Sequence, residues 1–150
     1  MRKFAVCIFI LFFMSCQNKR SSVDLFTEGE KLFKQHKYDE AIAKYEEGLK
    51  LSPNSAVGHN LVGMAYRFKY NALKDPSLRE KEIAAFNKAI EVDSTFWIAY
   101  INLGATYYYN ISKEKAIPYF EKALVLNPAN PEREELEKMI EEGKAKGKEQ

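Results

Sequence analysis

The sequence predicts an all-α fold, built as a row of three helix hairpins closed by a C-terminal capping helix. A sequence pattern returns along the chain, marked by Gly29, Gly63 and Gly104, which lie 34 and then 41 residues apart. Around each glycine, apolar residues recur three and four positions apart, which is the spacing of one helix face. A length of 150 residues suits one domain with one core.

The N-terminal residues 1–15 have the features of a lipoprotein-type signal peptide. Two basic residues precede an almost unbroken apolar run over residues 4–14. Eleven apolar residues are too few to span a bilayer comfortably, but they suit the apolar core of a secretory signal. The sequence turns polar directly after Cys16, so residues 16–21 are expected to form an acylated cysteine and a short tether.

The segment Phe13-Met14-Ser15-Cys16 resembles the lipobox of bacterial lipoproteins, although Phe13 stands where Leu is usual and Met14 is bulky. The resemblance implies cleavage before Cys16, acylation of its sulfur, and anchoring in a bacterial cell envelope, on the periplasmic or outer-membrane face. Two or more acyl chains hold a protein firmly on a membrane. An ordinary secretory signal and a short uncleaved anchor are the alternatives. Since Cys7 would leave with the leader, we expect no disulfide, zinc site or cysteine nucleophile.

The charge distribution argues against nucleic acid as a partner. The whole chain carries a formal net charge of +2, and two of its basic residues, Arg2 and Lys3, lie in the leader. The remainder is therefore balanced, whereas phosphate binding needs a clustered positive field.

The first unit, about residues 22–55, places Leu25, Gly29 and Leu32 on one helix face and ends its second helix before Pro53. The glycine is expected to let two helix backbones approach closely, at a helix-propensity cost of about 1 kcal/mol.

The second unit, about residues 56–96, carries seven extra residues, and we expect a longer loop or extended helix ends near residues 70–75. The sequence Ser77-Leu78-Arg79-Glu80 predicts a capping box at the start of its second helix.

The third unit, about residues 97–130, should start its second helix at an N-cap Ser112, with Pro118 costing a hydrogen bond or bending that start. Residues 131–150 then predict a capping helix, with Leu136, Met139 and Ile140 at helical spacing, and a tail rich in Lys and Glu.

Residues 22–130 resemble the tetratricopeptide repeat (TPR). The third unit carries the family pattern at Tyr100, Leu103, Gly104, Tyr107, Ala116, Phe120, Ala123 and Pro128. The resemblance implies a right-handed α-solenoid in which the first helix of each repeat lines a concave groove. Three positions depart from the pattern: Glu28 precedes the glycine of the first repeat, Leu32 replaces an aromatic residue, and Glu82 stands where a small residue normally lets two helices touch.

The resemblance also places a set of mostly aromatic and aliphatic residues in that groove as candidates for partner binding. They are Phe26, Phe33, Met64, Arg67, Phe68, Ile101, Tyr108 and Tyr109. The Lys/Asn/Arg clamp with which some family members bind C-terminal carboxylates is absent. Its aligned positions hold Phe26, Glu30, Leu61, Ile98 and Asn102. Arg67 and Lys34 are expected to be isolated charges in the groove. Packing of these side chains on neighbouring helices and self-association through the same patch are the alternatives.

No residue pattern points to catalysis, a cofactor or a metal. His36 is expected in an exposed turn and His59 in the core or at its rim, and the two lack a metal-ligand spacing. We therefore expect a non-enzymatic, lipid-anchored adaptor that binds a partner protein, in assembly or maintenance of a bacterial envelope complex. A carrier of a small apolar ligand or lipid in the same groove is the alternative, and an enzyme is the third class.

Overall fold

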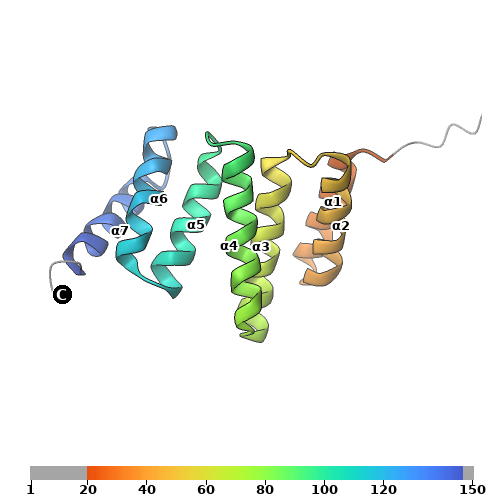
Figure 1. The fold of residues 1–150 in the computed structure, drawn as a ribbon, viewed down its shortest axis with the longest axis horizontal. Helices are drawn as coiled ribbons and strands as arrows, with labels where there is room; N and C mark the ends of the chain where they lie inside the picture. The colour runs from red at the N-terminus through yellow and green to blue at the C-terminus, as the bar shows by residue number, and fades with distance from the viewer. Residues whose placement is uncertain (1–19, 147–150) are drawn as a thin grey trace, which may run out of the picture.

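Residues 20–146 are described by the computed structural model, and every regular element in that range is an α-helix. The helices are α1 (Ser22–Lys34), α2 (Tyr38–Leu51), α3 (Ala56–Leu73), α4 (Pro76–Val92), α5 (Trp97–Asn110), α6 (Lys113–Leu126) and α7 (Arg133–Lys146). They stand side by side in one row, with α1 and α2 at one end and α7 at the other (Figure 1). The predicted signal peptide, Cys16 and most of the tether lie outside the described residues, as does the end of the tail.

Helices that follow one another in the chain pack as hairpins, α1 with α2, α3 with α4, and α5 with α6. Helix α7 packs on α6. The prediction of three helix hairpins and a capping helix is confirmed. Within residues 20–146, no helix is both long enough and apolar enough to cross a membrane.

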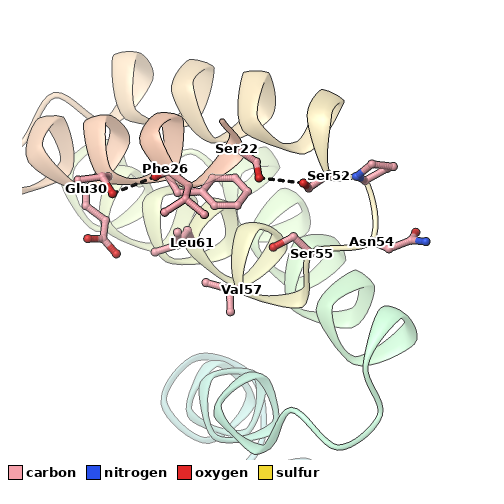
Figure 2. A pocket seen from close by; sticks show the side chains of 11 residues that line it. Ser22, Phe26, Glu30, Ser52, Asn54, Ser55, Val57 and Leu61 are labelled. Carbon is pink, nitrogen blue, oxygen red and sulfur yellow. Dashed lines mark hydrogen bonds between the residues drawn. The ribbon is translucent and has the colours of Figure 1, made fainter. Parts of the chain in front are cut away.

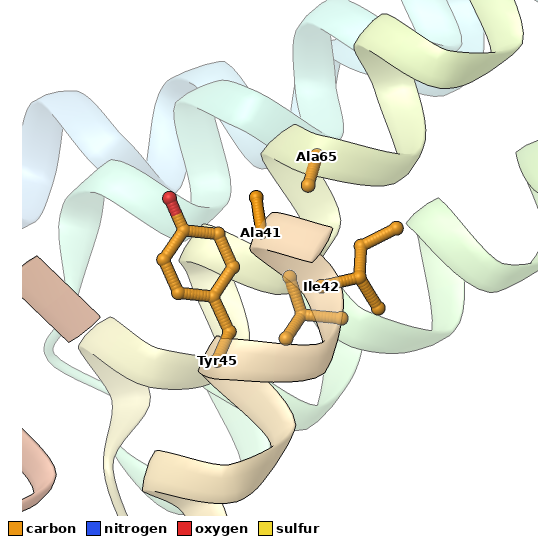
Figure 3. Packing of buried hydrophobic residues seen from close by; sticks show 5 residues of the cluster. Ala41, Ile42, Tyr45 and Ala65 are labelled. Carbon is orange, nitrogen blue, oxygen red and sulfur yellow. The ribbon is translucent and has the colours of Figure 1, made fainter. Parts of the chain in front are cut away.

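Each hairpin closes around an aromatic ring that lies against a bare glycine backbone. A Cβ atom at Gly29 would lie 2.4 Å from the Tyr45 ring, and one at Gly104 would lie 2.6 Å from the Phe120 ring. Both rings are buried, and Tyr45 shares its core with Ala41, Ile42 and other apolar residues (Figure 3). The glycines therefore make room for a ring of the facing helix, because any larger side chain would occupy the space of that ring, while the close approach of two helix backbones stays a prediction.

The start of α4 differs from the prediction. Asp75, not Ser77, is the N-cap, and its Oδ1 accepts a hydrogen bond of 2.9 Å from the Ser77 backbone N–H. Pro76 occupies the first helical position, where a missing N–H costs nothing and the fixed φ suits the helix. The expected capping box at Ser77 was therefore wrong, because the Asp75-Pro76 pair begins the helix earlier.

The extra residues of the second repeat lengthen both of its helices. Helices α3 and α4 have 18 and 17 residues, while α2, α5 and α6 have 14 each. Their hairpin projects beyond its neighbours in Figure 1. Of the two expected outcomes, the structure shows extended helix ends. The turn is made by Lys74, whose φ of 58° is left-handed.

Helix α7 covers the open face of the last repeat, as predicted. Its Leu136 and Ile140 are buried against Ala116 and Phe120 of α6. Helix α6 begins at the N-cap Ser112, whose Oγ accepts a hydrogen bond of 3.4 Å from Lys115 N–H. Pro118 is exposed inside α6, and the helix continues through it.

Candidate functional site

An open groove runs between the first helices of the first two repeats, α1 and α3. Its larger part is a cavity of about 650 Å³. Apolar side chains of both helices line it, among them Val23, Phe26, Val57 and Leu61, and the α2–α3 connection closes one end (Figure 2). At that end the Ser52 hydroxyl donates a hydrogen bond of 2.8 Å to the Ser22 hydroxyl, which ties the connection to the start of α1.

A second cavity of about 300 Å³ continues the groove along α1 and α3. It is lined by Glu30, Phe33, Lys34, Tyr45, Leu61 and Met64. Because Glu30 and Leu61 belong to both cavities, the two form one feature, which we call the α1/α3 groove.

Three of the eight predicted partner-binding residues line the α1/α3 groove: Phe26, Phe33 and Met64. Phe26 has a second role, because its ring fills space that Gly48 and Gly58 leave open. A Cβ atom at either glycine would lie 2.5 or 2.6 Å from that ring. The ring therefore fastens α1 to α2 and α3 while one side of it faces the groove.

Phe68 lies next to the groove rather than in its lining. Its ring packs edge-on against Phe33 at 5.0 Å between centroids, and Tyr38 completes the cluster at 6.1 Å from Phe68. These three rings come from α3, α1 and α2, so the cluster joins the first repeat to the second. Phe68 remains exposed on its outer side.

Arg67 is not the isolated groove charge that the sequence predicts. Its guanidinium donates to Glu82 Oε1 at 2.8 Å, to Asn102 Oδ1 at 3.1 Å and to Thr106 Oγ1 at 2.9 Å. It also lies over the Phe86 ring, 4.9 Å from the centroid. Arg67 thus links α3, α4 and α5 inside the solenoid, because a charge at this depth needs partners for most of its donors.

The remaining three candidates lie on the third repeat. Ile101 and Tyr108 pack against the buried cluster of α6 and α7. The Tyr108 hydroxyl donates to Glu142 of α7, and burial, with this hydrogen bond second, raises its pKa. Tyr109 is exposed and packs edge-on against Tyr108 at 4.9 Å. The structure therefore does not gather all eight candidates in one site, and their role in binding stays a prediction.

The sequence-based candidate set omitted the residues that close the larger cavity. These are hydroxyl and amide side chains of α1 and the α2–α3 connection: Ser22, Thr27, Ser52, Asn54 and Ser55. Pro53 was identified only as a helix stop signal, yet the turn it begins forms a wall of the groove. The sequence indicates a turn at Pro53, but the position of that turn opposite α1 depends on tertiary packing.

The groove presents apolar, hydroxyl and amide side chains together with the charged residues Glu30 and Lys34 and the phenol of Tyr45. Burial, with the Glu30 carboxylate as a second cause, raises the pKa of the Tyr45 hydroxyl to about 12, so Tyr45 is a neutral phenol at physiological pH. Within residues 20–146, no three His, Cys, Asp or Glu side chains are grouped to hold a metal ion. His36 is exposed with Nδ1 2.9 Å from the Tyr38 hydroxyl, and His59 Nε2 lies 2.9 Å from the Pro53 carbonyl oxygen.

Family profiles and relatives match this arrangement. A profile described as TPR repeat matches residues 29–67, and one described as tetratricopeptide repeat matches residues 98–130. The Hsp70-Hsp90 organizing protein of Triticum aestivum is 32% identical over 70% of this chain, and RNA polymerase II-associated protein 3 of Mus musculus is 32% identical over 75%. The matched regions span only 17% and 16% of those two proteins.

Solved structures show the same fold. The first TPR of Spaghetti (RPAP3), bound to the HSP90 peptide SRMEEVD, is 30% identical, with a TM-score of 0.66, over 81% of this chain and 91% of that chain. The Sgt2 TPR domain from Aspergillus fumigatus has a TM-score of 0.69 at 22% identity, over 85% and 80%. The predicted right-handed α-solenoid is thereby confirmed. The chain belongs to the tetratricopeptide repeat family.

Proposed function

We propose that this chain is an adaptor that holds a segment of a partner protein in the α1/α3 groove. The observation that carries the proposal is an open groove whose apolar walls face solvent. Val23 and Val57 are 68% and 51% exposed, although both line the larger cavity. Exposed apolar side chains gathered in a groove indicate an interaction site, and grooves between helices commonly take a peptide segment.

The solved relatives support a peptide as the bound species. The first TPR of Spaghetti (RPAP3) is described with the HSP90 peptide SRMEEVD, and its sequence is 30% identical to this chain. The similarity in fold supports a peptide-binding surface on this chain. The identity of the bound segment depends on the side chains in the groove of this chain.

We further propose that the chain is anchored to a bacterial envelope membrane through acylated Cys16. Support comes from the N-terminal sequence alone, since the relatives named above are eukaryotic proteins. Helix α1 begins at Ser22, which lines the larger cavity, so the groove opens six residues after Cys16. A partner held there would lie close to the membrane and serve assembly or maintenance of an envelope complex.

The anchor is tested by Cys16→Ala, which removes the acylated sulfur. We expect the variant to leave the membrane fraction and become soluble, while the wild-type chain stays in it. Retention of Cys16→Ala on membranes would show instead that the apolar residues 4–14 remain as an uncleaved anchor.

The adaptor role is tested by crosslinking and affinity recovery from membranes, with a Val23→Glu/Val57→Glu variant. Both positions are exposed, so the added charges should alter the groove and leave the helices intact, which circular dichroism checks. Val125→Glu is the matched control, because Val125 is 71% exposed on α6 and does not line the groove. A partner recovered by wild type and Val125→Glu, but lost in the double variant, supports the proposal. The same partner on all three would place the binding surface elsewhere.

A small apolar ligand is the second candidate, favoured by the smaller cavity of about 300 Å³ beside Phe33, Leu61 and Met64. Native mass spectrometry of the purified chain decides between the two. A bound mass that Met64→Glu removes, together with recovery of no partner, would support a carrier.

A further inference from the structure

Charged residues are distributed unevenly between the two cavities of the α1/α3 groove. Glu30 is the single charged residue among those that line the larger cavity, and it also lines the smaller one together with Lys34. The Glu30 side chain is exposed and forms no ion pair with any residue in the range 20–146. A carboxylate therefore stands at the junction of the two cavities, available to a cation.

No opposing charge lines the larger cavity beside Glu30, whereas Lys34 shares the smaller cavity with it. On the larger-cavity side, the neighbouring polar groups are hydroxyls and an amide, which carry no opposing charge. The charge of Glu30 also reaches the groove floor, because it contributes to the raised pKa of Tyr45, after burial. Low-dielectric walls such as Phe26 and Leu61 screen a charge less than open water does.

We infer that the α1/α3 groove selects an apolar segment that carries a basic residue, whose cationic head pairs with Glu30. This inference rests on the proposed adaptor function and adds the chemistry of the partner. Lys and Arg have apolar stems that can lie along Phe26 and Leu61 while the charged head stays in water near Glu30. An acidic segment in the larger cavity would meet Glu30, while the cation Lys34 lines only the smaller cavity, so such a segment is disfavoured by like-charge repulsion.

The test is a selection from a random dodecapeptide library displayed on phage. The full chain is held in lipid nanodiscs, and three forms are compared: wild type, Glu30→Lys and the control Glu46→Lys. Glu46 is exposed on α2 and does not line the groove, so the control carries the same change in net charge. Peptides that also bind the Val23→Glu/Val57→Glu variant are discarded, which leaves only groove-dependent binders.

We expect wild type and Glu46→Lys to enrich apolar peptides with Lys or Arg, and Glu30→Lys to enrich peptides with Asp or Glu. In direct titration, replacing the basic residue of a selected peptide by Glu should weaken binding to wild type roughly tenfold and strengthen it for Glu30→Lys. The peptide SRMEEVD should bind wild type more weakly than the selected peptides. The double-mutant cycle between Glu30 and the basic residue isolates their coupling.

Two failures are distinguishable. Groove-dependent peptides with the same charge preference on wild type and Glu30→Lys would overturn this inference and leave the adaptor proposal standing. Recovery of no groove-dependent peptide from wild type would overturn both.

Discussion

Glu82 lies fully buried on α4, at a position where the repeat pattern calls for a small side chain. Arg67 of α3 and Arg79 of α4 both donate to its carboxylate, and the Thr106 hydroxyl of α5 donates at 2.5 Å. A buried carboxylate persists only when it is paired and hydrogen-bonded. The second repeat thus tolerates its unusual residue because three helices supply partners for it.

Glu82→Ala should therefore destabilise the fold strongly. The change leaves two largely buried arginines without their shared anion, and breaking such a pair costs about 3–5 kcal/mol. Urea unfolding followed by circular dichroism measures the loss in free energy of unfolding. Glu91→Ala on the exposed face of α4 is the control, and its change should stay within about 0.5 kcal/mol. Equal effects of the two variants would show that the buried network contributes nothing.

Lys74→Gly should stabilise the chain. Lys74 ends α3 in the left-handed region with φ of 58°, a conformation that glycine adopts without steric cost. The gain is partly offset by the greater freedom of glycine in the unfolded chain, so we expect about 0.5–1 kcal/mol. The same urea experiment measures it. Lys88→Gly inside α4 should have the opposite sign, with a loss of about 1 kcal/mol.

At the scale of elements, α7 is fastened to the last repeat by both apolar and charged contacts. Glu142 of α7 accepts from the Tyr108 hydroxyl of α5 and from the Lys113 ammonium at 2.5 Å. The Lys113 hydrogen bond, followed by that of Tyr108, lowers the pKa of Glu142, and the Glu142 hydrogen bond is the main cause that raises the pKa of Lys113 to about 12. One carboxylate thereby joins α5, α6 and α7.

This arrangement predicts an acid-sensitive contact. Because the pKa of Glu142 is lower in the folded chain, its contribution to stability is present above the ordinary value of 4.5 and is lost as pH falls through the lowered pKa. The melting temperature should therefore drop less between pH 7 and pH 3 in Glu142→Gln than in wild type. Asp24 and Asp75 also have lowered pKa values, so both proteins should lose stability in acid. The measurement is therefore the melting temperature of wild type minus that of Glu142→Gln, followed as a function of pH. A difference in melting temperature that does not change with pH would contradict an acid-sensitive contribution of Glu142.

Pro118→Ala should stabilise α6. Proline at this interior position cannot donate to the Glu114 carbonyl four residues earlier, and a proline inside a helix costs about 3 kcal/mol or more. Since the site is exposed near the first turns, we expect a gain of about 1–3 kcal/mol in the free energy of unfolding. Thermal unfolding provides the measurement, and a lower melting temperature would show that Pro118 is fitted to its surroundings.

For the whole molecule, the helix order and the glycines at the helix crossings could be predicted because they repeat along the chain. The sequence places Gly29 at such a crossing, while only the structure shows that the ring of Tyr45 fills the space beside it. The site was less predictable. Arg67 reaches partners up to 39 positions away, and Tyr108 is engaged by Glu142, 34 positions later. Neither contact follows from a repeat pattern, because each depends on how separate helices pack.

Site-specific photocrosslinking tests whether the α1/α3 groove holds a partner protein, with a photoreactive amino acid at position 57 in the groove and, as control, at position 125 on α6. The full chain is expressed in living cells, so no partner need be chosen beforehand. We expect a discrete protein adduct from position 57 that position 125 does not give and that Val23→Glu abolishes. The same adducts from both positions, or none from position 57, would contradict it.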